Sequence, residues 1–152
     1  MRSNVTIRRA NAADAFEIGE VFIEARAEMA YLPDLHTEDE TRAFVAGVLA
    51  REQVWVAVLG RRVIGFAALN ADWLNHLYVH PDYQNSETGT ALLRMVRVLR
   101  PAGFQFWVFQ ENEGARRFYE RHGCKAAEFT DGGRNEEKLP DIRYKWRPAR
   151  TD

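Results

Sequence analysis

The sequence has one cysteine, Cys124, no long apolar run and no excess of either charge. A single cysteine excludes an intrachain disulfide and suits a reducing cytosol. The apolar stretches are too short to span a membrane, and the first residues lack the apolar core of a signal peptide. The 21 basic and 22 acidic residues give a net charge of -1, which argues against a nucleic-acid or membrane partner. We expect a soluble, cytoplasmic protein.

The composition is ordinary for a globular protein, with 46% hydrophobic and 28% charged residues. A chain of 152 residues is long enough for one proper core, and it shows no repeat, low-complexity segment or linker. We therefore expect a single domain over residues 1–152.

Local signals predict an alternation of strands and helices. Alternating, β-branched or aromatic runs predict strands at residues 5–8, 54–59, 63–69, 73–79, 104–109, 124–129 and 142–146. Apolar residues at helical spacing predict four helices, which carry residues 18–29, 44–49, 92–99 and 115–119. Helix starts are indicated at Asn11, Thr37 and Asn112, and a helix end at Gly123. The order β-α-α-β-β-β-α-β-α-β-β indicates an α/β domain with a partly antiparallel sheet.

The stretch HPDYQNSETGTALL, residues 80–93, joins a predicted strand to a predicted helix. Unpaired backbone N–H groups at such a helix N-terminus form an anion site. Close approach of a phosphate to the backbone favours glycine, but residue 87 is a glutamate. The loop therefore has the position of a phosphate site without its usual composition.

Two segments carry a resemblance to a known family. LYVHPDYQ resembles the end of the fourth strand and the pyrophosphate loop of the GNAT superfamily, and QENEGARRFYERHGC resembles a later segment of that fold. The order of elements also matches over essentially the whole chain. The resemblance implies a mixed, mostly antiparallel sheet of about seven strands, with strands four and five splayed apart, and four helices. The segment DGGRNEEKLPDIRYKW resembles a bacterial subgroup of generic acetyltransferases.

The resemblance also implies an activity. GNAT enzymes transfer an acetyl group from acetyl-CoA, as co-substrate, by direct attack within a ternary complex. The expected acceptor is a primary amine of a small molecule or a peptide, and a homodimer is the expected assembly. The matching segments imply that the cofactor contacts Leu77, Tyr78, Val79, Gln84, Asn85, Ser86, Glu87, Thr88, Gly89, Thr90, Asn112, Ala115 and Phe118.

Glu87 is the departure from the family pattern. Gln84 and Gly89 match it, but a carboxylate at position 87 repels a diphosphate, and its Cβ hinders close approach. We expect acetyl-CoA to bind, because backbone N–H groups and the helix dipole remain, but more weakly than to a glycine-bearing loop. The alternative is a GNAT-fold binding or regulatory module, in which Glu87, in place of the glycine of the pyrophosphate loop, has weakened or abolished cofactor binding.

The resemblance implies that Tyr119 is the general acid that protonates the departing thiolate. Its alternative is a core tyrosine. For the base, the fourth strand offers His76, which titrates near neutral pH, with Asp72 and Glu28 as carboxylate alternatives.

The acceptor is expected between the first two helices and the fourth strand, and the loop RNEEKLPD, residues 134–141, is expected to reach the same cleft. The residues predicted to contact the acceptor, with ordinary packing as the alternative, are Tyr31, Leu32, Asp72 and Trp73.

Other chemistries find less support in the sequence. A metal site at His76, His80 and Asp82 is disfavoured because four strand residues separate the two histidines by about 13 Å. Cys124 is predicted to be a small core residue. Either Arg116 or Arg117 is a candidate contact for a CoA phosphate, and otherwise belongs to a solvated helix face. A nucleotide-binding domain is set aside because the phosphate-loop and dinucleotide motifs are missing.

Overall fold

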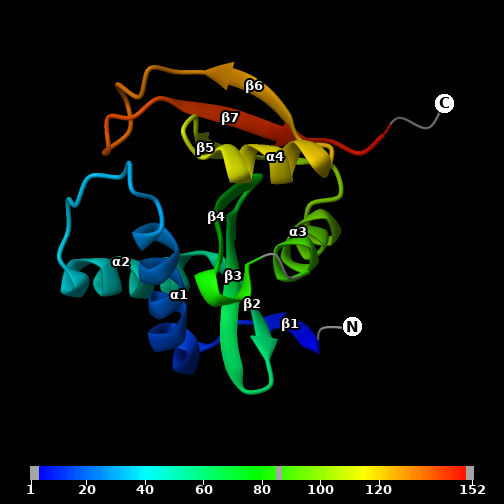
Figure 1. The fold of residues 1–152 in the computed structure, drawn as a ribbon. Coiled ribbons are helices and arrows are strands. Elements are labelled where there is room, and N and C mark those ends of the chain that lie inside the picture. Colours follow the sequence, from blue (N-terminus) through cyan, green and yellow to red (C-terminus); the bar gives the residue numbers. More distant parts are fainter. Residues whose placement is uncertain (1–3, 85–86, 150–152) are drawn as a thin grey trace.

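The fold is one mixed sheet with helices packed on both faces (Figure 1), and the computed structural model describes residues 4–84 and 87–149. The strands are β1 (Val5–Arg9), β2 (Gln53–Leu59), β3 (Arg62–Asn70), β4 (Trp73–Val79), β5 (Phe104–Phe109), β6 (Lys125–Phe129) and β7 (Asp141–Trp146). The helices are α1 (Ala15–Ala27), α2 (Glu38–Arg51), α3 (Thr88–Leu99) and α4 (Glu113–Arg121), with short 3₁₀ helices at Ala12–Asp14 and Pro81–Tyr83. The predicted order of strands and helices is confirmed.

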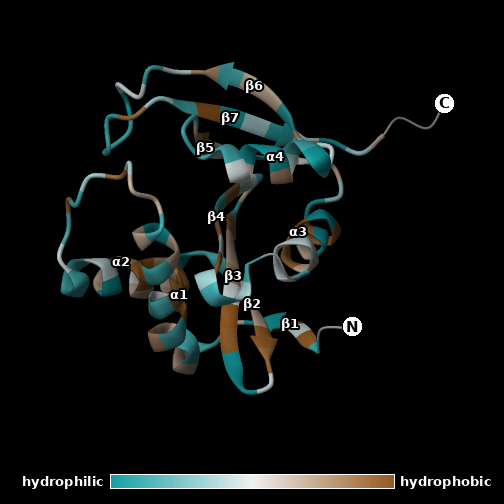
Figure 2. Cartoon of the chain, viewed as in Figure 1, coloured by the Kyte–Doolittle hydropathy of each residue, from teal (hydrophilic) through white to brown (hydrophobic). Residues whose placement is uncertain are grey.

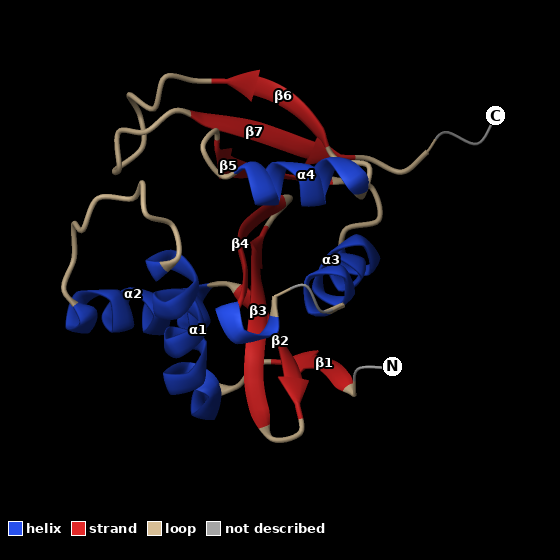
Figure 3. Cartoon of the chain, in the orientation of Figure 1, coloured by secondary structure: helices blue, strands red, loops and turns tan. Residues whose placement is uncertain are grey.

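The strands lie in the order β1-β2-β3-β4-β5-β7-β6. Neighbouring strands are antiparallel except β4 and β5, which are parallel and pair only through Trp73 and Gln105. Beyond that pair the two strands separate, so that β5, β7 and β6 form an arm beside the β1–β4 part of the sheet (Figure 3). The mixed sheet with splayed fourth and fifth strands is therefore confirmed.

The core is divided by the sheet into two hydrophobic clusters. Helices α1 and α2 pack on one face, and α3 and α4 pack on the other. Because both faces are covered, seven consecutive residues of β3 are buried, and β2 and β3 are strongly hydrophobic in Figure 2. The Cys124 side chain lies in the α3–α4 cluster at 2% exposure, as predicted, and burial raises the pKa of its thiol to about 11.

Polar side chains set the helix starts. The Thr37 side chain accepts a hydrogen bond from the backbone N–H of Glu40, and the Glu40 carboxylate accepts one from Thr37 in return, a capping box that begins α2. The Asn112 side chain accepts from the Ala115 N–H at 3.1 Å and begins α4. Gly123 follows α4 with a φ of 86°, a conformation that glycine adopts without strain.

Two local predictions differ from the structure. Asn11 caps the 3₁₀ helix Ala12–Asp14, which leads directly into α1. Because α1 ends at Ala27, Met29 lies beyond the helix instead of on its buried face. Phe44 is 46% exposed, although it was grouped with the buried Val45. Its ring instead contacts the ring of His76, with centroids 5.6 Å apart, at the edge of the α1–α2 layer.

Candidate active site

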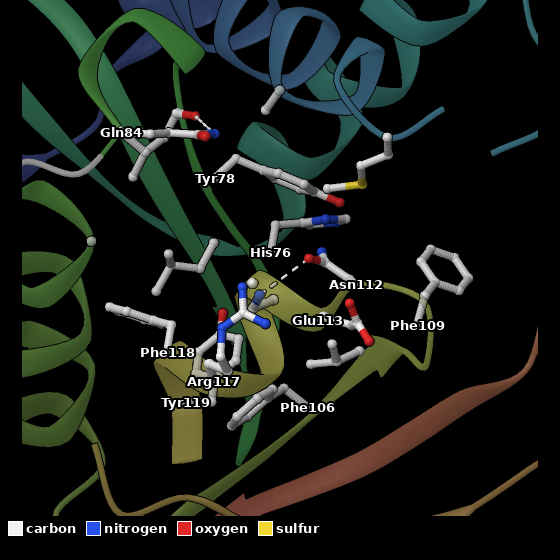
Figure 4. A pocket seen from close by; sticks show the side chains of 18 of the residues that line it. His76, Tyr78, Gln84, Phe106, Phe109, Asn112, Glu113, Arg117, Phe118 and Tyr119 are labelled. Carbon is white, nitrogen blue, oxygen red and sulfur yellow. Dashed lines mark hydrogen bonds between the residues drawn. The ribbon is translucent and has the colours of Figure 1, made fainter. Parts of the chain in front are cut away.

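A cavity of about 790 Å³ opens where β4 and β5 separate. Its walls come from β4, β5, α4, the C-terminal end of α1 with the loop after it, and the N-terminus of α3, and Figure 4 shows their side chains converging on it. Of the residues predicted to form the site, the cavity is lined by Tyr31, His76, Leu77, Tyr78, Val79, Gln84, Gly89, Thr90, Asn112, Ala115, Phe118 and Tyr119. Asn85 and Ser86 lie outside the described residues.

The remaining predicted site residues do not line this cavity. Asp72 and Trp73 lie at the start of β4, where the strand still pairs with β5, and the cavity lies toward the other end. The Asp72 carboxylate accepts a hydrogen bond from Gln105 at 3.1 Å, and the Trp73 ring stacks on Trp107. Leu32 is also absent from the cavity wall. The prediction that these three residues border the acceptor cleft is therefore not supported.

The N-terminus of α3 forms the end of the cavity near Val79. Gly89 lies in its first turn, where an added Cβ would be 3.4 Å from the Phe118 ring and 3.9 Å from the Val79 side chain. Glycine at this position keeps open the space between β4 and α4. The Gln84 side-chain amide donates to the Val79 carbonyl at 3.2 Å, where β4 has no neighbour in β5. This end combines the N-terminus of α3 with a narrow slot.

Glu87 is exposed and does not line the cavity. It occupies the N-cap position of α3, but its side chain makes no capping hydrogen bond. The following Thr88 is fully buried and does not line the cavity either. The carboxylate of Glu87 is thus free to point into solvent, away from an anion held in the slot.

Tyr119 lies in the cavity wall with only 8% of its surface exposed. Its ring packs against Phe106, with centroids 4.3 Å apart, and against Phe118 at 5.2 Å. Burial raises the pKa of its phenol above the ordinary value, so the hydroxyl is protonated at neutral pH. Within the part of the chain that the structure describes, this hydroxyl has no hydrogen-bond partner. The cavity wall thus contains a buried, protonated hydroxyl.

His76 lies opposite Tyr119, and aromatic rings surround it. The rings of Phe22, Phe44 and Tyr78 have centroids 5.6 to 6.2 Å from its own. Burial, together with the nearby Arg26 charge, lowers the pKa of His76 to about 4. A base with so low a pKa is a poor proton acceptor at neutral pH. The structure therefore argues against the predicted role of His76 as the general base.

A partly buried ion pair supports the wall next to His76. The Arg26 guanidinium donates to the Tyr78 hydroxyl at 3.3 Å and to the Glu137 carboxylate at 3.0 Å. Glu137 belongs to the loop between β6 and β7, and its neighbour Glu136 pairs with His36. The loop that was predicted to reach the cleft thus contacts α1, and it supports Tyr78 through Arg26. The loop itself does not line the cavity.

The sequence-based prediction missed several charged and aromatic residues of the wall. The missed charged residues are Glu111, which precedes α4, Glu113, which begins it, and Arg121, which lies two turns later. Arg117 and Glu28, which were considered from the sequence, also line the cavity. Arg116 donates instead to Gln110 and Tyr144. The helical spacing of residues 113, 117 and 121 places them on one face of α4, a signal that the sequence contained.

No helix within residues 4–84 and 87–149 has the length and apolar character that crossing a membrane requires. Over the same residues, no group of three or more His, Cys, Asp and Glu side chains is arranged to hold a metal ion.

Solved structures share this fold. A GCN5-related N-acetyltransferase from Rhodopseudomonas palustris superposes with a TM-score of 0.81 at 22% identity, covering 97% of this chain and 98% of that one. The structure of yncA from Salmonella typhimurium with its cofactor acetyl-CoA gives a TM-score of 0.72 at 20% identity, covering 99% of each chain. At these identities the likeness shows the fold alone.

Sequence comparisons identify the family. The chain is 26% identical to the uncharacterized N-acetyltransferase YafP of Escherichia coli, covering 85% of this chain and 93% of that protein. It is 27% identical to an uncharacterized N-acetyltransferase of Methanocaldococcus jannaschii, but that match covers only 51% of this chain and 41% of the relative. A family model described as an acetyltransferase (GNAT) domain matches residues 50–125, half of the chain. The protein therefore belongs to the GNAT family of acetyltransferases.

Proposed function

We propose that this protein transfers an acetyl group from acetyl-CoA, the co-substrate of its family, to a primary amine of a small molecule or peptide. The observation that carries the proposal is the cavity between the splayed strands β4 and β5, with the buried Tyr119 in its wall. A thioester bound along the free edge of β4 would place its sulfur beside Tyr119 in the cavity wall.

The proposed reaction is direct attack within a ternary complex. The neutral amine attacks the thioester carbonyl carbon, the carbon–sulfur bond breaks, and the departing thiolate takes the Tyr119 proton. The amine nitrogen gives up a proton as the amide forms, and Tyr119 regains a proton from solvent, so that one proton leaves the acceptor as one reaches the thiol. The carboxylates in the wall, Glu28, Glu111 and Glu113, are the groups suited to hold the acceptor ammonium and to take its proton.

The structure gives little support to the alternative of a binding module without cofactor. That alternative depends on Glu87, whose exposed side chain does not line the cavity. The features that favour a bound pyrophosphate, the α3 N-terminus and the glycine at position 89, are both present.

The proposed cofactor position is tested by filling the slot beside Gly89. We expect Gly89→Leu to weaken acetyl-CoA binding at least tenfold in calorimetric titration, because its side chain would grow into the space between Val79 and Phe118. The matched control is Gly47→Leu in α2, which does not line the cavity and meets only the flexible end of Arg51. Equal affinity of the two variants would contradict the proposed position.

A further inference from the structure

The acidic and the basic residues near α4 that line the cavity lie at different ends of this helix. Glu111 and Glu113 lie at its beginning, whereas Arg117 and Arg121 lie one and two turns further along. Figure 4 shows Glu113 on the side of Phe109, and Arg117 on the side of Phe118. Phe118 contacts the first turn of α3. The arginines therefore lie on the side of the cavity where the N-terminus of α3 favours a phosphate.

The end of the cavity next to Glu111 and Glu113, here called the acidic end, also contains the hydroxyl of Tyr31, which has no hydrogen-bond partner among the described residues. The Tyr31 side chain lines the cavity, and its ring contacts that of Phe109 with centroids 6.0 Å apart. Its hydroxyl oxygen is buried and has no hydrogen-bond partner among the described residues. Burial, together with the nearby Tyr78 and the Glu111 carboxylate, raises the pKa of this phenol to about 12. A buried polar group without a partner is costly unless a ligand satisfies it.

The same end offers no free cation among the residues that the structure describes. The arginines lining the cavity, within the described residues, are those of the later turns of α4, and no lysine lines it. The Arg26 guanidinium, which reaches Tyr78 at this end, is already paired with Glu137. His76 is neutral at physiological pH because burial lowers its pKa to about 4. An acceptor that carried a carboxylate beside its amine would meet acids here with no unpaired positive partner.

We propose that the acceptor is an amine with an apolar or aromatic body and no carboxylate next to the reacting nitrogen, held by Tyr31 and Glu111. The Tyr31 hydroxyl and the Glu111 carboxylate accept hydrogen bonds from the ammonium, and the rings of Tyr31 and Phe109 enclose the adjoining carbons. This inference rests on the proposed acetyl transfer and names the class of substrate for the same site. It excludes free α-amino acids acetylated at the α-nitrogen.

Matched pairs of acceptors test the inference. We expect kcat/KM, followed by release of the CoA thiol, to be at least tenfold higher for 2-phenylethylamine than for phenylalanine, and likewise for tyramine over tyrosine. Each pair differs only in the carboxylate beside the nitrogen. An amino acid that is used as well as its amine would overturn the inference.

Binding separates this inference from the proposed function. Calorimetric titration of 2-phenylethylamine and of phenylalanine is carried out on the free protein and on its complex with CoA. We expect the amine to bind at least tenfold more tightly than the amino acid in one or both forms. If acetyl-CoA binds but neither acceptor does at millimolar concentration, the acceptor class is wrong while the proposed function stands. If acetyl-CoA fails to bind, the proposed function fails, and titration of the free protein still decides the acceptor class.

Two variants test the named residues. Tyr31→Phe is expected to raise KM for 2-phenylethylamine at least threefold without lowering the melting temperature, because the lost hydroxyl has no partner among the described residues. Glu111→Gln is expected to narrow the preference for the amine over phenylalanine to less than threefold. The matched control is Glu24→Gln, which removes an exposed acid that does not line the cavity. An unchanged KM in Tyr31→Phe, or an unchanged preference in Glu111→Gln, would refute the assignment.

Discussion

Replacing Tyr119 by phenylalanine separates catalysis from packing. The ring contacts with Phe106 and Phe118 remain in Tyr119→Phe, and the lost hydroxyl has no hydrogen-bond partner among the described residues. The free energy of unfolding should therefore stay the same or rise slightly. If the hydroxyl protonates the thiolate, kcat should fall about 100-fold, the lower end for general acid catalysis, which equals about 2.7 kcal/mol in activation free energy.

The assay is steady-state release of the CoA thiol, with acetyl-CoA affinity measured separately by calorimetry. We expect kcat and kcat/KM to fall together while the dissociation constant for acetyl-CoA changes less than twofold. Tyr144→Phe is the matched control, since it removes a buried tyrosine hydroxyl that bonds Glu120 but does not line the cavity. That variant should lose stability and retain turnover. A kcat in Tyr119→Phe within threefold of the unmodified protein would refute the role of Tyr119 as acid.

Two further substitutions test residues that the sequence singled out. His76→Phe should keep kcat within about threefold at pH 7, because a group with a pKa near 4 is neutral there, and a large fall in kcat would restore His76 as the base. The unfolded histidine has a pKa of 6.5, so His76 lowers stability as pH falls from about 6.5 to about 4. At pH 4.5 this amounts to about 2 to 3 kcal/mol relative to pH 8, a loss that denaturant unfolding should find in the unmodified protein and not in the variant. Glu87→Gly should tighten acetyl-CoA binding by no more than about threefold, a gain that shrinks in high salt, because the exposed carboxylate is screened by water. A tenfold or larger gain in calorimetric titration would show that the Glu87 side chain does obstruct the slot.

The fold was predictable because its signals are local. The caps at Thr37 and Asn112 and the glycine after α4 depend on residues a few positions apart, and each lies where the sequence indicated. The proposed cofactor side of the cavity is similarly local, since its walls are the end of β4, the start of α3 and one face of α4. Short stretches of sequence therefore contained most of that side.

The acceptor side was less predictable because it is assembled from distant segments. Tyr31 meets Phe109 only when the loop after α1 folds against the end of β5, a contact between residues far apart in the chain. The low pKa of His76 depends on rings contributed by α1, α2 and β4, which no local pattern reveals. Asp72 was placed at the cleft because strand register and the point of separation of β4 and β5 cannot be read from the sequence.

The central claim is that acetyl-CoA binds this protein in its folded state. Thermal unfolding with and without acetyl-CoA tests the claim most directly, since a ligand at 100 times its dissociation constant adds about 2.7 kcal/mol to the free energy of unfolding. For a chain of this size that corresponds to a rise in melting temperature of about 5 to 10 °C. We predict such a rise for the unmodified protein and for the Gly47→Leu control, and a clearly smaller one for Gly89→Leu. An unchanged melting temperature of the unmodified protein at millimolar acetyl-CoA would contradict the account.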